Sequence, residues 1–181
     1  LERVRDKDAL YVVTSDRVDA QLLDAAPRVK IVATGSVGFN HIDLAACAAR
    51  GVAVTNTPDV LTEATADMAW ALLAATARRI CESEHWLRAG HWKRWAWDQF
   101  LGQDLYRSTL GIVGMGRIGS AVARRARGFE MRIIYNTRSV AANESELGAR
   151  RVDLDELLRE ADHVVLVLPY SSRTHHVIGE R

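Results

Sequence analysis

The chain has 181 residues, 48% of them hydrophobic, which is enough for a globular core in one large or two small domains. Its 24 basic and 23 acidic residues give a formal net charge of +1, so no overall field favours nucleic acid or an anionic membrane surface. No apolar run of about 18 residues and no signal-like start are present. Cys47 and Cys81 lack CxxC spacing and are expected to be buried, reduced thiols, so we expect a cytoplasmic protein without nucleic-acid or membrane partners.

The first third of the chain alternates strand and helix patterns, which is typical of an α/β domain. A glycine-containing loop, residues 35–40, follows the second strand pattern, and Pro58 interrupts the pattern after the third. We therefore expect a first domain over residues 1–59. Its predicted elements are the strand Ala9–Val13, the helix Val18–Ala26, the strand Val29–Ala33, the helix Leu44–Arg50 capped by Asp43, and the strand Val52–Val54.

A long helical pattern and a tryptophan-rich segment follow. Apolar residues recur at three-and-four spacing from Thr62 to about Arg88, which predicts a single helix that leaves the first domain and crosses the next. After Gly90 the sequence HWKRWAWDQFLGQDLY has no clear period and holds three tryptophans in six positions. Such an arm is typical of an interface, so we expect a homodimer contact here; the alternative is that the rings pack beneath the long helix.

A glycine motif dominates the second half of the chain. The predicted strand Thr109–Val113 precedes Gly114, Gly116 and Gly119, which have GxGxxG spacing, and a helical pattern follows. In such a motif the first glycine allows the turn, the second lets the backbone approach a pyrophosphate, and the third lets the helix pack on the sheet. The unpaired amides at the start of the helix favour the same anion. The alternative is that the glycines serve packing alone.

The residues after the next strand, predicted over Met131–Tyr135, bear on the choice of dinucleotide. NAD sites usually have an Asp or Glu here that binds the ribose 2′-hydroxyl, whereas this chain has Asn136, Thr137, Arg138 and Ser139. An amide, hydroxyls and a guanidinium can donate hydrogen bonds to a 2′-phosphate, which a carboxylate would repel. We therefore expect NADP in preference to NAD; the alternative for Arg138 is a solvated loop cation.

The remaining patterns account for only the first half of a doubly wound sheet. Gly128 is expected to end the helix after the glycine motif, Asp153 to cap a further helix, and His163–Leu168 to form a third buried strand. Because the chain begins at Leu1 rather than Met and stops at Arg181, we expect both domains to be incomplete. A local basic group is expected to form a solvated helix face: Arg124, Arg125, Arg127 and Arg132.

Three motifs in one order carry a family resemblance: GSVGFNHID at 35–43, NTPDVLTEATADMAWALL at 56–73 and GIVGMGRIGSAVARRARGF at 111–129. Together they resemble the D-isomer-specific 2-hydroxyacid dehydrogenases, and within them the NADP-dependent glyoxylate and hydroxypyruvate reductases. The resemblance implies an α/β protein of two Rossmann-like domains with parallel sheets. A flavodoxin-like substrate domain would cover residues 1–59 and a dinucleotide-binding domain residues 60–181, with the active site between them and a homodimer built on the cofactor domain.

The same resemblance assigns the binding residues. The backbone amides of Val37 and Gly38 are expected to bind the substrate carboxylate, and adjacent N–H groups in a glycine-containing loop suit an anion. The residues expected to bind the cofactor are Thr65, Gly114, Gly116, Arg117, Ile118, Gly119, Asn136, Arg138, Ser139, Leu168 and Pro169. In a turn before the first cofactor strand, Arg107 and Ser108 stand where the family commonly has Gly and Lys.

No catalytic residue is assigned, because the family's Arg, Glu and His belong to motifs that follow the end of this chain. The six histidines here are expected to have structural or solvated roles, and no metal site is expected. The favoured function is reduction of a small 2-oxo acid, of the glyoxylate or hydroxypyruvate type, with hydride from NADPH. The alternatives are a non-catalytic dinucleotide-binding or dimerisation module, and an NAD-linked D-glycerate or other D-2-hydroxyacid dehydrogenase.

Overall fold

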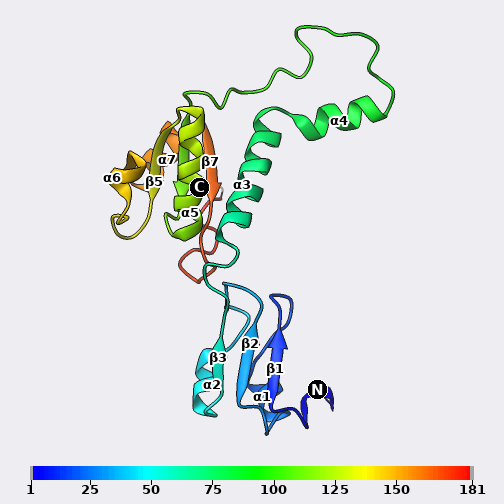
Figure 1. The fold of residues 1–181 in the computed structure, drawn as a ribbon, viewed down its shortest axis with the longest axis vertical. Coiled ribbons are helices and arrows are strands. Elements are labelled where there is room, and N and C mark those ends of the chain that lie inside the picture. Colours follow the sequence, from blue (N-terminus) through cyan, green and yellow to red (C-terminus); the bar gives the residue numbers. More distant parts are fainter. Residues whose placement is uncertain (1, 180–181) are drawn as a thin grey trace. The chain divides into compact units, whose positions relative to one another are not determined.

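The computed structural model describes residues 2–179, which form two compact units (Figure 1). One unit takes in the described residues up to Leu61 together with those from Pro169 onward, and the other is Thr62–Leu168. Each unit contains its own parallel sheet with helices packed on it. The predicted α/β class with parallel sheets is therefore confirmed, whereas the functional division into residues 1–59 and 60–181 stays a prediction.

The first unit has a three-stranded parallel sheet in the order β1-β2-β3. Asp19 and Asp43 cap its two helices by accepting hydrogen bonds from the amides of Leu22 and Ala46, at 3.0 and 2.9 Å. The cap at Asp19 makes the first helix shorter than predicted. The elements are η1 (Glu2–Val4), β1 (Ala9–Val12), α1 (Ala20–Asp24), β2 (Ile31–Thr34), α2 (Leu44–Ala49) and β3 (Ala53–Thr55).

The second unit has a four-stranded parallel sheet in the order β6-β5-β4-β7. Its central strand β4 is buried along its whole length, because helices cover both faces of the sheet. Helices α3 and α5 pack on one face and α7 on the other. The elements are α3 (Thr62–Ala77), α4 (Ile80–Arg88), β4 (Thr109–Val113), α5 (Arg117–Ala126), η2 (Arg127–Phe129), β5 (Arg132–Asn136), α6 (Glu144–Leu147), β6 (Ala149–Arg151), α7 (Leu154–Glu160) and β7 (His163–Leu166).

Three features of this sheet differ from the sequence prediction. Strand β6 was not predicted, because two of the three residues in Ala149–Arg151 are arginines and the sequence has no apolar alternation. Strand β7 was predicted to be buried, yet Leu166 is 50% exposed because β7 lies at the edge of the sheet. Helix α5 does not stop at Gly128: it ends at Ala126, and the left-handed residue that closes the following turn is Glu130, with φ of 52°.

The single helix predicted over Thr62–Arg88 is two helices, with Arg79 in the left-handed region at φ 53° between them. The break has a clear cause. The amide of Gln103 donates to the carbonyl oxygen of Ala77 at 2.8 Å, so the returning chain satisfies a carbonyl at the end of α3. A Cβ on Gly102 would lie 2.3 Å from that same oxygen, so the crossing requires a glycine. Cys81, just past the break, is exposed rather than buried as expected.

The arm between α4 and β4 carries exposed tryptophans. Trp92, Trp95 and Trp97 are 53%, 76% and 74% exposed, so they do not pack beneath a helix in the chain itself. Trp86 on α4 packs edge-on against Phe100, with ring centroids 5.4 Å apart. Trp86, Trp92 and Trp95 line one groove of about 710 Å³. The tryptophan arm, residues 89–108, therefore presents exposed aromatic rings beside a groove.

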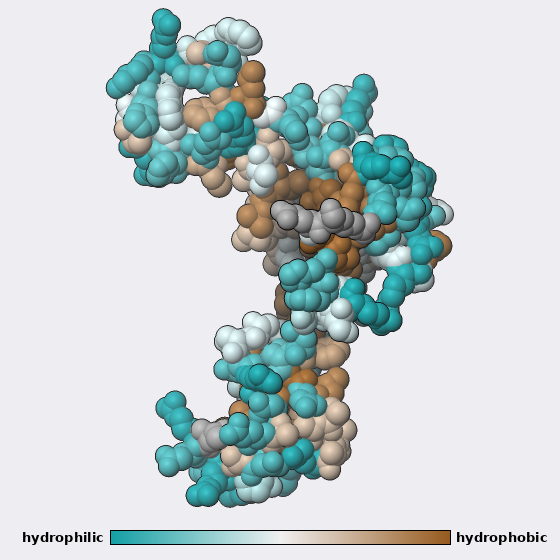
Figure 2. Space-filling model, turned by 180° about the vertical axis from the view of Figure 1, so that it is seen from behind, coloured by the Kyte–Doolittle hydropathy of each residue, from teal (hydrophilic) through white to brown (hydrophobic). Residues whose placement is uncertain are grey.

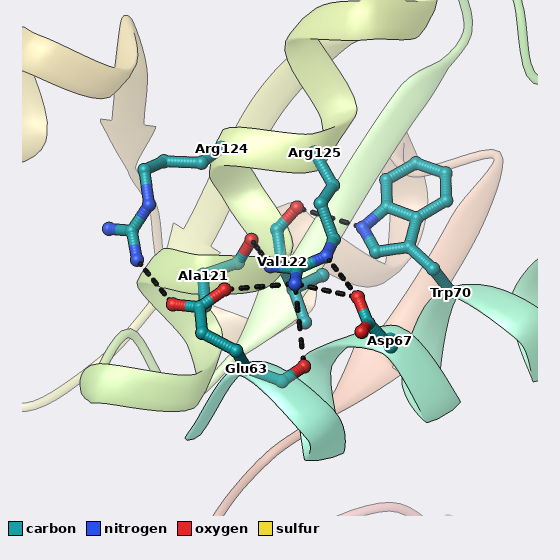
Figure 3. Close-up of polar contacts among 7 residues, drawn as sticks. All are labelled: Glu63, Asp67, Trp70, Ala121, Val122, Arg124 and Arg125. Atoms are coloured by element: carbon teal, nitrogen blue, oxygen red, sulfur yellow. Dashed lines mark hydrogen bonds and ion pairs between the residues drawn. The ribbon is translucent and has the colours of Figure 1, made fainter. Parts of the chain in front are cut away.

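Opposite charges join two helices that cover the same face of the sheet (Figure 3). Arg125 on α5 lies 2.6 Å from Asp67 and 2.9 Å from Glu63, both on α3. Arg124 lies 3.2 Å from Glu63. These two arginines therefore do not form a purely solvated face as predicted, and they hold the glycine-motif helix against α3.

Trp70 adds a buried link between the same helices. Its indole Nε1 donates to the carbonyl oxygen of Val122 on α5 at 2.9 Å (Figure 3). Its ring stacks on Phe129 with centroids 4.9 Å apart and an interplanar angle of 7°. Apolar contact and a satisfied N–H thus fix the position of α5, whose first turn lies next to the glycine motif.

We expect the α3–α5 ion pairs to make stability depend on pH. The hydrogen bond from Arg125 lowers the pKa of Glu63 from its usual value of 4.5. A carboxyl with a lowered folded pKa stabilises the fold above about pH 4.5, and the contribution is lost as the pH falls through the folded value. The urea midpoint of Glu63→Gln should therefore vary less below pH 4.5 than that of the unmutated protein, with the exposed Glu146→Gln as control. Equal pH slopes would contradict this role of Glu63.

None of the helices in residues 2–179 combines the length and apolarity that a membrane crossing requires. Hydrophobic residues nevertheless gather on the face of the second unit that Figure 2 shows. An apolar groove of about 870 Å³ lies between α3 and β7, lined among others by Met68, Leu72, Val165 and Leu166.

Candidate dinucleotide and carboxylate sites

The glycine motif lies at a point where the strand order of the second sheet reverses. Strand β4 pairs with β5 on one side and β7 on the other. The amide of Gly114 donates to the carbonyl oxygen of Asn136 at the end of β5, and the amide of Val167 donates to Val113 at the end of β4, both at 2.9 Å. The carboxyl ends of three parallel strands therefore meet around Gly114. Open α/β sheets bind ligands at such a switch point.

Each glycine of the motif has a different environment. Gly114 has φ of +105°, and a Cβ there would lie 2.6 Å from the carbonyl oxygen of Val167. A Cβ on Gly119 would lie 2.1 Å from the carbonyl oxygen of Gly114. A Cβ on Gly116 would meet nothing within 4 Å. The chain's own packing thus explains Gly114 and Gly119 but not Gly116, whose open side is free for a ligand.

We expect Gly119→Ala to destabilise the second unit. The added methyl group would lie 2.1 Å from the carbonyl oxygen of Gly114, so α5 must move away from β4. Overpacking of this kind costs roughly 1–3 kcal/mol. Thermal or urea unfolding of the variant measures the loss, and an unchanged midpoint would show that the helix has room to shift.

The start of α5 offers backbone donors beside Gly116. Gly116 is the N-cap residue of α5 and has no side chain to cap the helix. The amide of Ser120 donates to the carbonyl oxygen of Gly116 at 2.8 Å. The amides of Ile118 and Gly119 donate to no other described residue. Together with the helix dipole they form a positive site suited to a pyrophosphate. Arg117 is exposed at the first position of the helix.

The loop after β5 holds the residues predicted to recognise a 2′-phosphate. Arg138 and Ser139 are exposed. Asn136 is half-buried, and its Nδ2 donates to the carbonyl oxygen of Val152 at 2.9 Å, so this amide shapes the loop. The Thr137 hydroxyl likewise donates within the loop, to the carbonyl oxygen of Ser139. Of the four polar residues, Arg138 and Ser139 are thus the ones whose side chains extend to the surface.

Two further contacts hold this loop in place. The guanidinium of Arg151 donates from Nε to the carbonyl oxygen of Thr137 and from Nη2 to that of Arg138, both at 3.0 Å. The buried Tyr135 hydroxyl accepts from the Ala141 amide at 2.9 Å and donates to Glu144. Burial, with that bond to Glu144, raises the pKa of Tyr135, which keeps the phenol a neutral donor.

The other predicted cofactor residues are distributed unevenly. Leu168 lies against Gly114, since its Cδ2 would be 3.0 Å from a Cβ there. Thr65 lines the apolar groove together with Leu166 and Val167, so it lies near the carboxyl end of β7. Pro169 is grouped with the other compact unit, and its place beside a cofactor stays a prediction.

The loop after β2 in the first unit presents three adjacent backbone amides. The carbonyl oxygen of Ser36 accepts from the Thr57 amide at 3.1 Å, that of Val37 from Asn56 Nδ2 at 2.9 Å, and that of Gly38 from the Ser36 hydroxyl at 2.7 Å. All three are trans peptides, in which the C=O and N–H bonds point in opposite directions.

The N–H group that follows each of these carbonyls therefore points away from the group that donates to the carbonyl. The N–H groups of Val37, Gly38 and Phe39 donate to no other described residue. Three successive amides without an internal acceptor are available to a small anion such as a carboxylate, and we call this candidate site the carboxylate cradle. This carboxylate cradle contains both residues that the sequence assigned to substrate binding.

Comparison with known proteins identifies the family. Residues 70–181 match the sequence profile described as "D-isomer specific 2-hydroxyacid dehydrogenase, NAD binding domain". The chain belongs to this family. The switch point described above thus lies in the part of the chain that matches the NAD binding domain of this family.

Relatives extend the similarity over the whole chain. It is 56% identical over 185 residues to a glyoxylate reductase of Thermococcus onnurineus, covering 99% of this chain and 55% of that protein. It is 51% identical over 182 residues to a glyoxylate reductase of Korarchaeum cryptofilum, with the same shares. The chain thus spans about half the length of the curated relatives it matches.

Solved structures of the family are similar in fold. D-lactate dehydrogenase from Aquifex aeolicus, complexed with NAD and lactic acid, has a TM-score of 0.87 and 33% identity, covering 96% of this chain and 52% of that one. A glyoxylate reductase from Paecilomyes thermophila has a TM-score of 0.84 and 36% identity, covering 97% and 55%. The fold and family expected from the three sequence motifs are confirmed.

Sequence reasoning missed residues that form hydrogen bonds in the two candidate sites. Arg151 supports the loop after β5 from a strand that carried no recognisable period. Thr34, Ser36 and His41 lie in or beside the GSVGFNHID motif, where only Val37 and Gly38 were assigned roles. The signal was present for the second group, since a serine and a histidine flank the two cradle residues in a polar loop.

Proposed function

We propose that the protein carrying this chain reduces a small 2-oxo acid of the glyoxylate or hydroxypyruvate type to the corresponding 2-hydroxy acid, with NADPH as hydride donor. The observation that carries this proposal is the open side of Gly116 at the switch point, next to free amides of α5. Relatives named glyoxylate reductase, aligned along nearly the whole chain, support the choice of substrate.

The chain's own residues have binding and orienting roles in this reaction. The first turn of α5 would bind the pyrophosphate, and the carboxylate cradle at Val37 and Gly38 would orient the 2-oxo acid through its carboxylate. The nicotinamide, when bound, supplies the hydride. No residue of this chain is assigned the transfer of a proton to the carbonyl oxygen.

A preference for NADP over NAD is part of the proposal. Asn136 replaces the carboxylate that would repel a 2′-phosphate, and Arg138 and Ser139 are exposed beside it. Arg151 adds a second guanidinium to the same loop, bound to the backbone of Arg138. This arrangement supports recognition of a phosphate dianion.

A homodimer through the tryptophan arm is proposed as well. The exposed rings of Trp92, Trp95 and Trp97, with the groove beside Trp86, are the kind of aromatic surface that a subunit interface buries. Free thiols at Cys47 and Cys81 support a cytoplasmic location, since reducing conditions keep thiols unpaired.

Steady-state kinetics of a full-length protein carrying this chain tests the proposal. We expect NADPH oxidation that depends on glyoxylate or hydroxypyruvate, at a higher kcat/KM than with pyruvate. Tight NADPH binding without turnover of any 2-oxo acid would favour the non-catalytic module. Higher kcat/KM with NADH would favour the NAD-linked alternative.

A further inference from the structure

A chain of buried hydroxyl groups runs behind the carboxylate cradle. His41 Nε2 lies 3.1 Å from Thr34 Oγ1, which lies 2.8 Å from Ser36 Oγ, and Ser36 Oγ lies 2.7 Å from the carbonyl oxygen of Gly38. Thr34 and Ser36 are 2% and 9% exposed, so solvent does not replace these bonds. These hydrogen bonds thus link a half-buried histidine to the backbone of the cradle.

The direction of each hydrogen bond from His41 through Thr34 and Ser36 to Gly38 follows from donor and acceptor chemistry. A carbonyl oxygen only accepts, so the Ser36 hydroxyl uses its single proton on Gly38. Ser36 Oγ must then accept from the Thr34 hydroxyl, which in turn must accept from His41. His41 therefore carries a proton on Nε2, and all the bonds run from His41 toward the cradle.

We propose that His41, Thr34 and Ser36 are positioning residues that fix the amides of the carboxylate cradle for the 2-oxo acid. This positioning role rests on the proposed function, and none of the three residues touches a reacting atom. The Ser36 hydroxyl holds the Gly38 carbonyl, and the trans peptide then points the Phe39 N–H the other way. Thr34 holds the Ser36 hydroxyl in that rotamer, and His41 holds Thr34. An oriented amide binds an anion without reorganising first.

The kinetic test uses the full-length protein and a graded set of variants. Ser36→Ala should raise KM for the 2-oxo acid roughly tenfold, the effect expected for loss of about one hydrogen bond, with kcat within about threefold. Thr34→Val should have a smaller effect and His41→Phe the smallest, since each is one link further from the cradle. Thr34→Ser, which keeps the hydroxyl, should rescue KM to within about twofold. KM for NADPH should not change, and the exposed Ser15→Ala serves as control.

The order of the three effects carries the proposal. An unchanged KM for the acid in Ser36→Ala, or an equal fall in kcat across all three variants, would overturn it. A KM in Thr34→Ser as high as that in Thr34→Val would also overturn it, because the hydroxyl that serine keeps and valine lacks would then not determine KM.

A second measurement needs no turnover, and so separates this proposal from the proposed function. The ¹⁵N NMR shifts of the neutral His41 ring should report a proton on Nε2, and Ser36→Ala should shift the amide signals of Gly38 and Phe39. A proton on Nδ1, or unmoved amide signals, would overturn the positioning chain even in an active enzyme. If the NMR result holds but the unmutated protein reduces no 2-oxo acid, the proposed function fails and the carboxylate use of the cradle fails with it.

Discussion

Gly116→Val is expected to weaken NADPH binding more than roughly a hundredfold while leaving the fold intact. The backbone at Gly116 is extended, with φ of −82° and ψ of −159°, so its φ does not require a glycine. A Cβ there meets nothing within 4 Å, so the folded chain has room for the side chain. The valine would instead fill the space in front of the α5 amides, where the pyrophosphate is proposed to bind. Fluorescence titration with NADPH measures the loss, and unfolding curves check the fold.

Gly128→Val is the matched control for this variant. A Cβ on Gly128 also meets nothing within 4 Å, but Gly128 lies beyond the far end of α5. The same side chain added there should leave the NADPH affinity within about twofold of the unmutated value. Equal affinity in Gly116→Val and Gly128→Val would mean that the open side of Gly116 does not bind the pyrophosphate.

Arg138→Ala is expected to remove most of a preference for NADPH over NADH. A hydrogen bond to a charged group contributes about 1.5–3 kcal/mol, which corresponds to more than tenfold in affinity. The loss should appear in kcat/KM for NADPH and be nearly absent for NADH, because NADH has no 2′-phosphate. The exposed Arg159→Ala, on α7, tests whether loss of any surface cation has the same effect.

Two results would contradict the role of Arg138. A higher kcat/KM for NADH in the unmutated protein would show that the loop after β5 does not select for the phosphate. Equal losses with both dinucleotides in Arg138→Ala would show that Arg138 supports the fold of the loop rather than the ligand.

Local chemistry predicted the central parts of the second unit. The strand Thr109–Val113 was predicted with the bounds that it has, and so was the turn into a helix at the three glycines that follow it, since an apolar run followed by GxGxxG leaves few alternatives. The caps at Asp43 and Asp153 were also predicted, because an N-cap depends on residues only three positions apart.

Features that depend on distant residues were not predicted. The break between α3 and α4 arises from Gln103, which donates to Ala77 from 26 positions away, and no local breaker marks Arg79. The edge position of β7 depends on sheet order rather than on its own apolar sequence. Arg125 looked like a solvated cation until the fold brought Asp67 within 2.6 Å.

The candidate sites show the same limit. Sequence motifs named Gly116, Val37 and Gly38, but whether a position is open to a ligand follows only from the packed structure. The Asn136 amide was expected to face a phosphate, whereas its Nδ2 donates to the carbonyl oxygen of Val152, directly after β6. That contact could not be predicted, because β6 itself was not.

A crystal structure of a full-length protein carrying this chain, with NADPH bound, tests the central claim most directly. We predict a pyrophosphate against the amides at the start of α5, on the open side of Gly116, and a 2′-phosphate beside Arg138 and Ser139. A dinucleotide bound elsewhere, or one whose 2′-phosphate contacts neither Arg138 nor Ser139, would contradict the account.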